Sequence, residues 1–396
     1  MKTILKIILL IFFSGTCHSQ ENEKKIKTYV DFLEKQNTSA KDYILNLFKN
    51  HDVVILTERH HGDIEQYNLF LSIISDPYFI KNIGAVYTEV GVTNKRDDIN
   101  RFLNSSRLSN SEMKQKVIEL YQSIDYNHLW TYYSFPWLLE QLYTLNQNNK
   151  KDKVNLYPCD LAFDWKDVNT IEEYNRFDKS EELKKRDSIM AKIFLNQFNE
   201  IQKKRNNKKK ALVIMNTRHG YLKDTHYSEK EIRNNFGRYL QEQLGQKVAS
   251  VYLMGMGHPS NWKDYTVIKD GTWDYAFEST NRTDTGFNLK QTPFGMETFD
   301  ATPNGWITDK LLYQDVFTGI VFYKPIEMHI KKTGWENVLT PDFVPEIRRR
   351  LKLMGYNEQE TEEMVDFYQD VKTSSCYYNL EQERKRIDQW KSVMTK

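Results

Sequence analysis

The hexapeptide Thr57–Gly62 brings together side chains that can move protons. It contains the carboxylate of Glu58 and the imidazoles of His60 and His61, and it directly follows the apolar run Val53–Leu56. Such a run, followed by a segment of helical period, is typical of a buried parallel strand that leads through a loop into a helix. Ligands bind at the carboxyl ends of such strands. The hexapeptide is therefore a candidate for general acid–base chemistry or for holding a metal ion.

Polar side chains follow four further apolar runs at the same relative position. They are Glu89 after 84–88, Asp160 after 154–157, Arg218 and His219 after 211–215, and His258 after 248–253. Parallel strands place their carboxyl ends at one edge of a sheet, so we expect these groups to converge. Capping of the next helix explains one such acid, but the recurrence at successive strand ends favours a shared site.

The alternation of these runs with helical patterns predicts an α/β fold, in which a mostly parallel sheet is flanked by helices in Rossmann-like layers. A last strand is expected at 319–323, and helices are expected near 63–75, 181–204 and 229–244. We divide the chain into a signal peptide at 1–19, an N-terminal helical lead at 20–50, an α/β catalytic-type domain at 51–330 with a helical insertion over about 95–150, and a helical C-terminal extension at 331–396. The aromatic residues of the insertion pack as a core between its helices or shape a pocket. The charged tail is expected to be a peripheral cap.

Residues 1–19 have the pattern of a secretory signal peptide: a basic start, a short apolar core and a small-residue cleavage region. The core is too short to span a bilayer as a mature helix. We therefore expect an exported protein, periplasmic or secreted, cleaved after Ser19 and without a transmembrane span. Lipid attachment at Cys17 is less favoured, because Ser14 stands where the lipoprotein pattern has Leu.

The net charge limits the kinds of binding partner to expect, and the cysteine content limits the disulfides. Removing 1–19 takes away two lysines and no acid, so the formal net charge falls from +2 to 0. No overall field then attracts nucleic acid or anionic lipid, and a small-molecule substrate is expected instead. The remaining cysteines, Cys159 and Cys376, are too few for a disulfide scaffold and form one bridge or stay free. The sequence does not indicate an oligomeric state.

Four short motifs resemble the erythromycin esterase family. Glu58-x-x-His61-Gly62 is similar to its Gly-Glu-x-x-His-Gly motif, and Glu89 follows His61 by 89 − 61 = 28 positions, a spacing that fits the family. The segment Arg186-Asp187-x-x-Met190-Ala191 is similar to the family's Arg-Asp-x-x-Met-Ala, and 215–219 lies where the family has a strand-end Asn and His. The resemblance extends in outline over about 52–323. The wider superfamily includes ChaN-like haem-binding proteins and Tiki-type metalloproteases, whose Gly-Glu-x-His motif matches Glu58-Arg59-His60 instead.

Hydrolysis of an ester, lactone or related bond by an activated water suits these residues and is what the esterase resemblance implies. His61 is expected to act as the base, with Glu58 and Glu89 as orienting carboxylates. His219 is expected to act as the acid or a second base. Arg186 or Arg218 would stabilise charge on the carbonyl oxygen. No cofactor is required for this reaction.

Two alternatives stay open at this stage. His60, His61, Glu89 and His219 also offer nitrogen and oxygen ligands to a divalent metal, as in a Tiki-type metal-dependent protease. The superfamily resemblance equally allows a non-enzymatic haem- or metal-binding protein. Asp160, Arg218 and His258 are further candidates at the rim. No Gly-x-Ser-x-Gly elbow occurs, and Cys159 favours a buried structural thiol over a nucleophile.

Overall fold

The structure is a computed structural model that describes residues 23–149, 151–204, 208–228, 231–233, 235–258, 264–301 and 311–394. Within these ranges, no helix combines the length and the apolar character needed to cross a membrane. The predicted signal peptide lies outside the described residues, so export stays a prediction.

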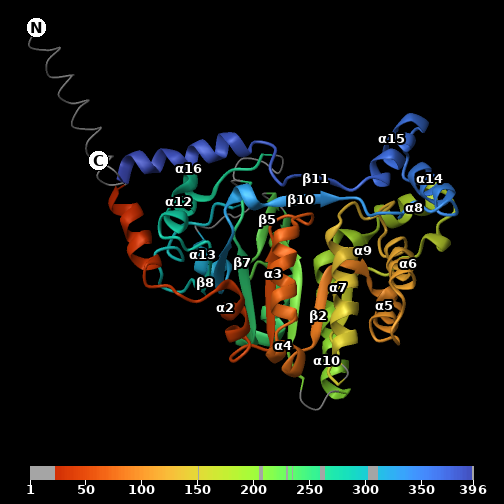
Figure 1. The fold of residues 1–396 in the computed structure, drawn as a ribbon, viewed down its shortest axis with the longest axis horizontal. Helices are drawn as coiled ribbons and strands as arrows, with labels where there is room; N and C mark the ends of the chain where they lie inside the picture. Colours follow the sequence, from red (N-terminus) through yellow and green to blue (C-terminus); the bar gives the residue numbers. More distant parts are fainter. Residues whose placement is uncertain are drawn as a thin grey trace, which may run out of the picture.

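A seven-stranded sheet forms the centre of the molecule (Figure 1). Its strands, in spatial order, are β3 (Asn155–Asp160), β2 (Ala85–Val92), β4 (Ala211–Asn216), β1 (Val53–Glu58), β7 (Val248–Leu253), β9 (Gly319–Tyr323) and β8 (Asp284–Asn288). All neighbouring strands are parallel except β8, which runs antiparallel to β9 at the edge. The α/β fold expected from the sequence is confirmed, and β8 is the strand that the sequence pattern missed.

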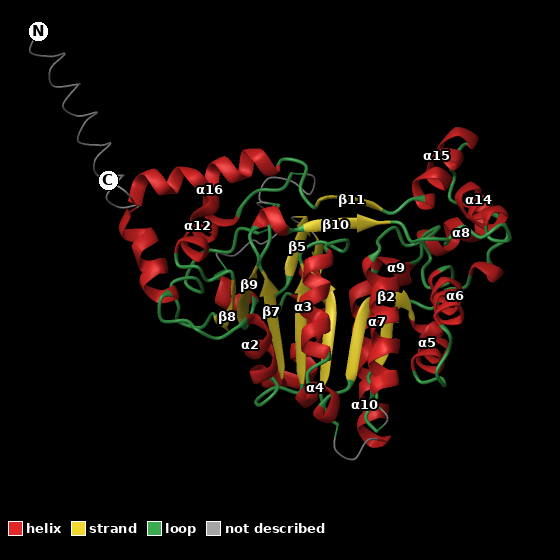
Figure 2. Cartoon of the chain, viewed as in Figure 1, coloured by secondary structure: helices red, strands yellow, loops and turns green. Residues whose placement is uncertain are grey.

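Helices cover both faces of the sheet, as Figure 2 shows. One face carries α2 (Ala40–Leu47), α3 (Ile64–Ile74), α4 (Pro77–Asn82), α5 (Arg96–Leu103), α6 (Asn110–Tyr121) and α7 (Ser134–Asn148); the other carries α10 (Arg186–Lys204) and α11 (Phe236–Leu244). Along β1, Val54 and Leu56 are buried against the first layer, whereas Val53 and Ile55 are buried against the second. Burial on both faces explains why these strands are continuously apolar.

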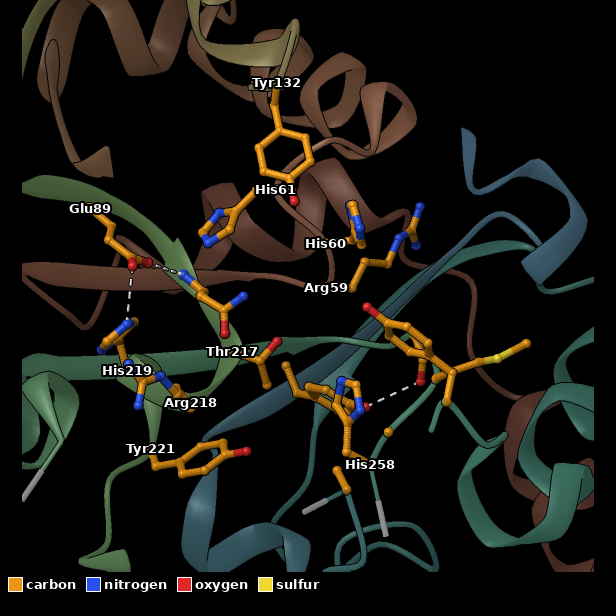
Figure 3. Close-up of a pocket in the computed structure, with 17 residues that line it drawn as sticks. Arg59, His60, His61, Glu89, Tyr132, Thr217, Arg218, His219, Tyr221 and His258 are labelled. Carbon is orange, nitrogen blue, oxygen red and sulfur yellow. Dashed lines mark hydrogen bonds and ion pairs between the residues drawn. The ribbon is translucent and has the colours of Figure 1, made fainter. Parts of the chain in front are cut away.

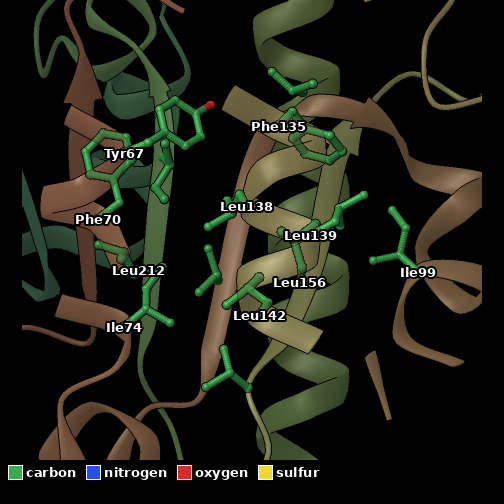
Figure 4. Packing of buried hydrophobic residues seen from close by; sticks show 14 of the residues in the cluster. Tyr67, Phe70, Ile74, Ile99, Phe135, Leu138, Leu139, Leu142, Leu156 and Leu212 are labelled. Atoms are coloured by element: carbon green, nitrogen blue, oxygen red, sulfur yellow. The ribbon is translucent and has the colours of Figure 1, made fainter. Parts of the chain in front are cut away.

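The packing of the first layer is shown in Figure 4, where side chains of α3 and α7 meet over the strands. Tyr67, Phe70 and Ile74 of α3 and Leu138, Leu139 and Leu142 of α7 are all buried in one apolar cluster with Leu156 and Leu212 of the sheet. The helical insertion expected over about 95–150 therefore consists of α5, α6 and α7, and α7 belongs to the core.

Two helical predictions differ from the structure in their bounds. The helix expected over 181–204 is split at Lys185 into α9 (Glu181–Lys184) and α10, so Arg186 begins a helix. The helix expected over 229–244 begins only at Phe236, because residues 231–233 form β6, which pairs with β5 (Thr225–Ser228). The remaining helices are one at 23–33, α8 (Ile171–Asp178), α12 (Thr272–Ser279), α13 (Tyr313–Val316), α14 (Val344–Leu353), α15 (Glu358–Gln369) and α16 (Leu380–Met394).

The C-terminal segment is largely helical, as expected, but it is more than a peripheral cap. Its strand β11 (Lys372–Ser375) pairs antiparallel with β10 (Ile330–Thr333), and this ribbon lies across the carboxyl ends of the central strands (Figure 1). Lys332 donates its backbone N–H to the carbonyl of Gly62 at 3.0 Å. Just after β11, the buried hydroxyl of Tyr377 accepts from the backbone N–H of Met256. The tail therefore packs against the loops that follow β1 and β7.

Candidate active site

The turn that follows β1 is held in one shape by its own side chains. Arg59 donates from Nε to Asp63 at 2.5 Å, and its Nη1 donates to the carbonyls of Met254 and Tyr323. Asp63 also caps α3 by accepting from the backbone N–H of Glu65. A capped helix start on one side and a strand end on the other leave the intervening histidines little freedom.

Glu58 and His61 form a carboxylate–imidazole pair at this turn. Glu58 is the last residue of β1 and is 1% exposed, and its Oε2 lies 2.9 Å from Nδ1 of His61. The carboxylate fixes the proton on Nδ1, because only a donor can face it. Nε2 of His61 makes no hydrogen bond with any described residue and is the nitrogen able to accept a proton.

The environment of His61 favours its protonated form relative to a free histidine. Burial alone would lower the pKa of His61, but the charges of Glu58 and Glu89 outweigh it and raise the pKa above the ordinary value. The insertion supplies the outer wall: the ring of Trp130 meets that of His61 edge-on at 5.2 Å, and Tyr132 lies 6.1 Å away. Tyr132 lines the cavity, as considered for these aromatic residues, whereas Trp130 packs against the ring of His61.

Glu89, near the end of β2, is a carboxylate whose two oxygens both contact neighbouring groups. Its Oε1 accepts from both Nη atoms of Arg186 at 3.1 Å and lies 3.1 Å from Nε2 of His219. Its Oε2 accepts from the backbone N–H of Asn216 at 2.8 Å. Burial opposes ionisation, but the charges of His219 and Arg186 hold the pKa of Glu89 well below its usual range. Glu89 is therefore ionised and fixed in place.

Arg186 and Asp160 lie behind Glu89. The guanidinium of Arg186 makes a two-pronged contact with Asp160, Nε to Oδ1 at 2.9 Å and Nη2 to Oδ2 at 2.8 Å. With Glu89 on its other edge, Arg186 has no spare donor pair for a carbonyl oxygen, and neither it nor Asp160 lines the cavity. These two residues position Glu89. The stabilising role expected for Arg186 at the reacting carbonyl does not fit this geometry.

The second imidazole, His219, is held between two carboxylates. Its Nδ1 lies 2.8 and 2.9 Å from the two oxygens of Asp187, and its Nε2 faces Glu89. Each ring nitrogen therefore faces a carboxylate, and Nη1 of Arg186 also lies 3.5 Å from Nε2. Burial acts against the charge, but Asp187 and Glu89 raise the pKa of His219 above its ordinary value. These contacts favour the imidazolium form of His219.

Asp187 is the site residue that the strand-end argument did not select. It lies in the first turn of α10 rather than after a strand, and it also accepts from the backbone N–H of Phe236 at the start of α11. The Arg186-Asp187 motif was its only signal in the sequence. The two neighbours do not serve as one ion pair: Arg186 contacts Glu89 and Asp160, whereas Asp187 contacts His219.

Glycines permit the close approaches that this arrangement requires. A Cβ on Gly220, directly after His219, would lie 2.6 Å from Cγ2 of Thr57. Gly91, which follows Glu89 by two residues, has φ of +103° and passes Pro158 of β3. Side chains at these positions would push β4 away from β1 or strain β2.

His61, Glu89 and His219 face one cavity of about 320 Å³ (Figure 3). The other residues that line it are Arg59, His60, Tyr132, Asn216, Thr217, Arg218, Tyr221, Tyr252, Gly255, Met256, Gly257, His258, Tyr265 and Ala301. The carboxylates Glu58 and Asp187 lie behind the imidazoles that they orient. Four predicted residues, Glu58, His61, Glu89 and His219, thus come together, and Arg218, His60 and His258 border the same space.

The geometry of the turn gives His60 and His61 different environments. Nδ1 of His60 accepts from the backbone N–H of Gly62 at 3.0 Å, and burial together with the charge of His61 lowers the pKa of His60 to about 3. His60 is therefore neutral. Figure 3 shows it on the side of the cavity away from Glu89, whereas His61 lies toward Glu89. Burial likewise lowers the pKa of His258.

The cysteines take no part in this chemistry. Cys159 and Cys376 are both buried and free, so the bridge left open by the sequence does not form. Burial and the neighbouring charge of Asp160 raise the pKa of the Cys159 thiol well above its ordinary value, which disfavours the thiolate that a nucleophile requires.

The contact between Asp187 and His219 generates a prediction. In Asp187→Asn, burial of His219 is opposed by Glu89 alone, so we expect its pKa to fall, as followed by NMR titration of the imidazole. The stabilisation from this pair needs an ionised Asp187 and a protonated His219, whose ordinary pKa values are 3.8 and 6.5. Because the pKa of Asp187 is lowered and that of His219 raised on folding, the stability gap between wild type and variant is widest between these values. It narrows as pH rises through the raised pKa of His219.

Urea unfolding at pH 5 and pH 9 measures that gap. Asp178→Asn, at an exposed position distant from the cavity, is the matched control and should alter neither quantity. An unchanged titration of His219 in Asp187→Asn would contradict the assignment.

Known proteins similar to this chain are found among solved structures. No protein-family model matches the chain, and no curated protein matches its sequence. Among solved structures, the chain is similar to a protein from Bacillus cereus (13% identity, TM-score 0.43, 76% of this chain and 97% of that one). It is also similar to the erythromycin esterase EreC in its open conformation (10% identity, TM-score 0.46, 71% and 92%) and to a succinoglycan biosynthesis protein (11% identity, TM-score 0.46, 76% and 97%). Identities and TM-scores this low do not indicate a shared activity.

Proposed function

We propose that this chain is an exported hydrolase that cleaves an ester, lactone or related acyl bond with an activated water. One observation carries the proposal: two imidazoles with different numbers of carboxylate partners face the same cavity. In the proposed reaction His61, whose Nε2 has no hydrogen-bond partner among the described residues, accepts a proton, and His219, which faces a carboxylate at each nitrogen, donates one. A base and an acid on opposite sides of one substrate are what acyl hydrolysis requires.

In the proposed reaction, water bound beside His61 gives a proton to Nε2 as its oxygen attacks the carbonyl carbon. Glu58 holds Nδ1–H and stabilises the imidazolium that forms, as a carboxylate does in a catalytic triad. The tetrahedral intermediate then collapses, and the leaving alkoxide takes the proton from Nε2 of His219. Glu89 releases that N–H and keeps its contacts with Arg186 and Asn216. Proton transfer from His61 to His219 through solvent restores the starting state.

A divalent metal is the second reading, because Glu58, His61 and Glu89 each offer a ligand atom and these atoms lie within 4.8 Å of one another. Oε1 of Glu58 is buried without a hydrogen-bond partner among the described residues, which fits a ligand. The surroundings of Glu89 do not fit. Its Oε1 contacts the cations Arg186 and His219, which would repel a metal ion, and its Oε2 accepts from the backbone N–H of Asn216. The proposed reaction therefore uses no metal ion.

Haem is the remaining alternative from the sequence. Neutral His60 has the protonation state of an axial ligand, but the cavity lies near the lower end of the roughly 300–1,000 Å³ range of small-molecule sites. A small acyl substrate suits that volume better than a macrocycle does.

Replacement of the base tests the reaction. In His61→Ala, hydrolysis of para-nitrophenyl acetate should fall by about 10²–10⁴-fold, the usual contribution of a positioned base. His51→Ala is the matched control, since His51 precedes β1 at the opposite edge of the sheet. Initial rates with folding checked by circular dichroism measure the effect, and full activity in His61→Ala would rule the mechanism out.

The pH dependence of kcat/KM should report His61. The base must be neutral, so activity falls as pH decreases through a pKa that Glu58 has raised. In Glu58→Gln the negative charge is removed, so the pKa of His61 drops and the acidic limb moves to lower pH, with a lower plateau from poorer orientation. An acidic limb that stays at the same pH in Glu58→Gln would show that another group is titrating.

Chelation separates the hydrolase from its metal-dependent alternative. After dialysis against EDTA and transfer to metal-free buffer, we expect the hydrolysis rate to be unchanged, because no step uses an ion. Loss of activity that returns on addition of Zn²⁺ would instead establish the metal-dependent reading.

A further inference from the structure

Among the described residues that line the cavity, Arg218 is the charged one whose side chain has no hydrogen-bond or ion-pair partner. It lies on the short 3-10 turn η3 (Thr217–Gly220) directly after β4, is partly buried, and lines the cavity beside His219 (Figure 3). Among the described residues, nothing forms a hydrogen bond or ion pair with its guanidinium. Its charge acts on His219 and Asp187 only at longer range.

The other ionised groups that line or back the cavity are matched. Glu58 is paired with His61, Glu89 with Arg186, Asp187 with His219, and Arg59 with Asp63. The remaining imidazoles at the rim, His60 and His258, have lowered pKa values and add no charge at neutral pH. Among the described residues that line the cavity, Arg218 is therefore the charged side chain without an ion-pair partner.

Contact with the reacting carbonyl oxygen is a poor explanation for Arg218. Donors that stabilise an oxyanion act through preorganisation, fixed in place before charge develops. His219 meets that condition, because Asp187 and Glu89 hold its ring on both sides. Nothing in the described part of the protein holds the guanidinium of Arg218, so its geometry must be set by the ligand.

We propose that Arg218 binds an anionic oxygen group, a carboxylate or a phosphate, that the substrate carries next to its scissile ester. A guanidinium offers paired donors that match such groups. Tyr221 borders the same space, and burial raises the pKa of its hydroxyl, so it stays neutral and does not repel an anion. Among the described residues, the one acid that lines the cavity is Glu89, and its Oε1 is already in contact with Arg186 and His219. The turnover part of this inference rests on the proposed hydrolase function; the binding part does not.

The kinetic test compares the mono-para-nitrophenyl ester of glutaric acid with its methyl-capped, uncharged analogue. Wild type should prefer the anionic ester in kcat/KM by at least about tenfold, the size of a hydrogen bond between charged groups. Arg218→Gln should abolish the preference, mainly through KM. Arg218→Lys should retain part of it, because lysine keeps the charge but loses the paired donors.

The binding test uses no turnover. Calorimetric titration of wild type and Arg218→Gln with glutarate, and separately with inorganic phosphate, shows which anion the site holds. Arg238→Gln is the matched control, since Arg238 on α11 is paired with Asp224 and Glu242 and does not line the cavity. Arg238→Gln should keep both the kcat/KM preference for the anionic ester and the affinity for the anion.

Two results would overturn the proposal. One is an equal loss of kcat for the charged and uncharged esters in Arg218→Gln, which would place Arg218 at the carbonyl oxygen. The other is that wild type binds neither anion more tightly than Arg218→Gln does. If wild type hydrolyses neither ester yet binds an anion through Arg218, the hydrolase function fails and the anion site stands.

Discussion

The ionised carboxylate of Glu89 is the contact on which the arrangement of the site depends. It joins β2 to the backbone of β4 through Asn216, to α10 through Arg186, and to the turn after β4 through His219. Each of these charges would cost several kcal/mol to bury alone, and together they offset one another. Such a network is intolerant of single changes, because removing one partner leaves the others buried and unmatched. The carboxyl edge of the sheet is therefore kept in register by electrostatics as much as by backbone pairing.

The two histidines acquire different roles from the number of acceptors around them. His219 has a carboxylate at each nitrogen, whereas His61 has one at Nδ1 only. Both pKa values are raised, yet only His61 has a nitrogen without a hydrogen-bond partner among the described residues. Neither Glu58 nor Asp187 lines the cavity, so in the proposed reaction these carboxylates orient their imidazoles without meeting substrate. In the proposed reaction, chemically similar pairs thus take the roles of base and acid through position alone.

Much of this organisation is predictable from the sequence, and the exceptions have physical causes. Continuous apolar runs identify the central strands because burial on both faces demands them, and the strand-end rule selects Glu58, Glu89 and His219. Edge strand β8 is exposed at its first and last residues and has no such run. Asp187 belongs to a helix start, so its contact depends on how α10 is placed over the sheet. The choice between His60 and His61 depends on a turn geometry that no periodicity encodes.

The ribbon of β10 and β11 ties the beginning of the site to the end of the chain. Residue 62 is hydrogen-bonded to β10, and β10 is completed by β11 more than three hundred positions after the first histidine. Contacts of such sequence separation form late in folding, since the entropy of closing a long loop must be met first. A chain still emerging from the ribosome would therefore have its central sheet before the ribbon that packs against the loop after β1. The backbone contact at Gly62 becomes part of a complete ribbon only once residue 375 has been made.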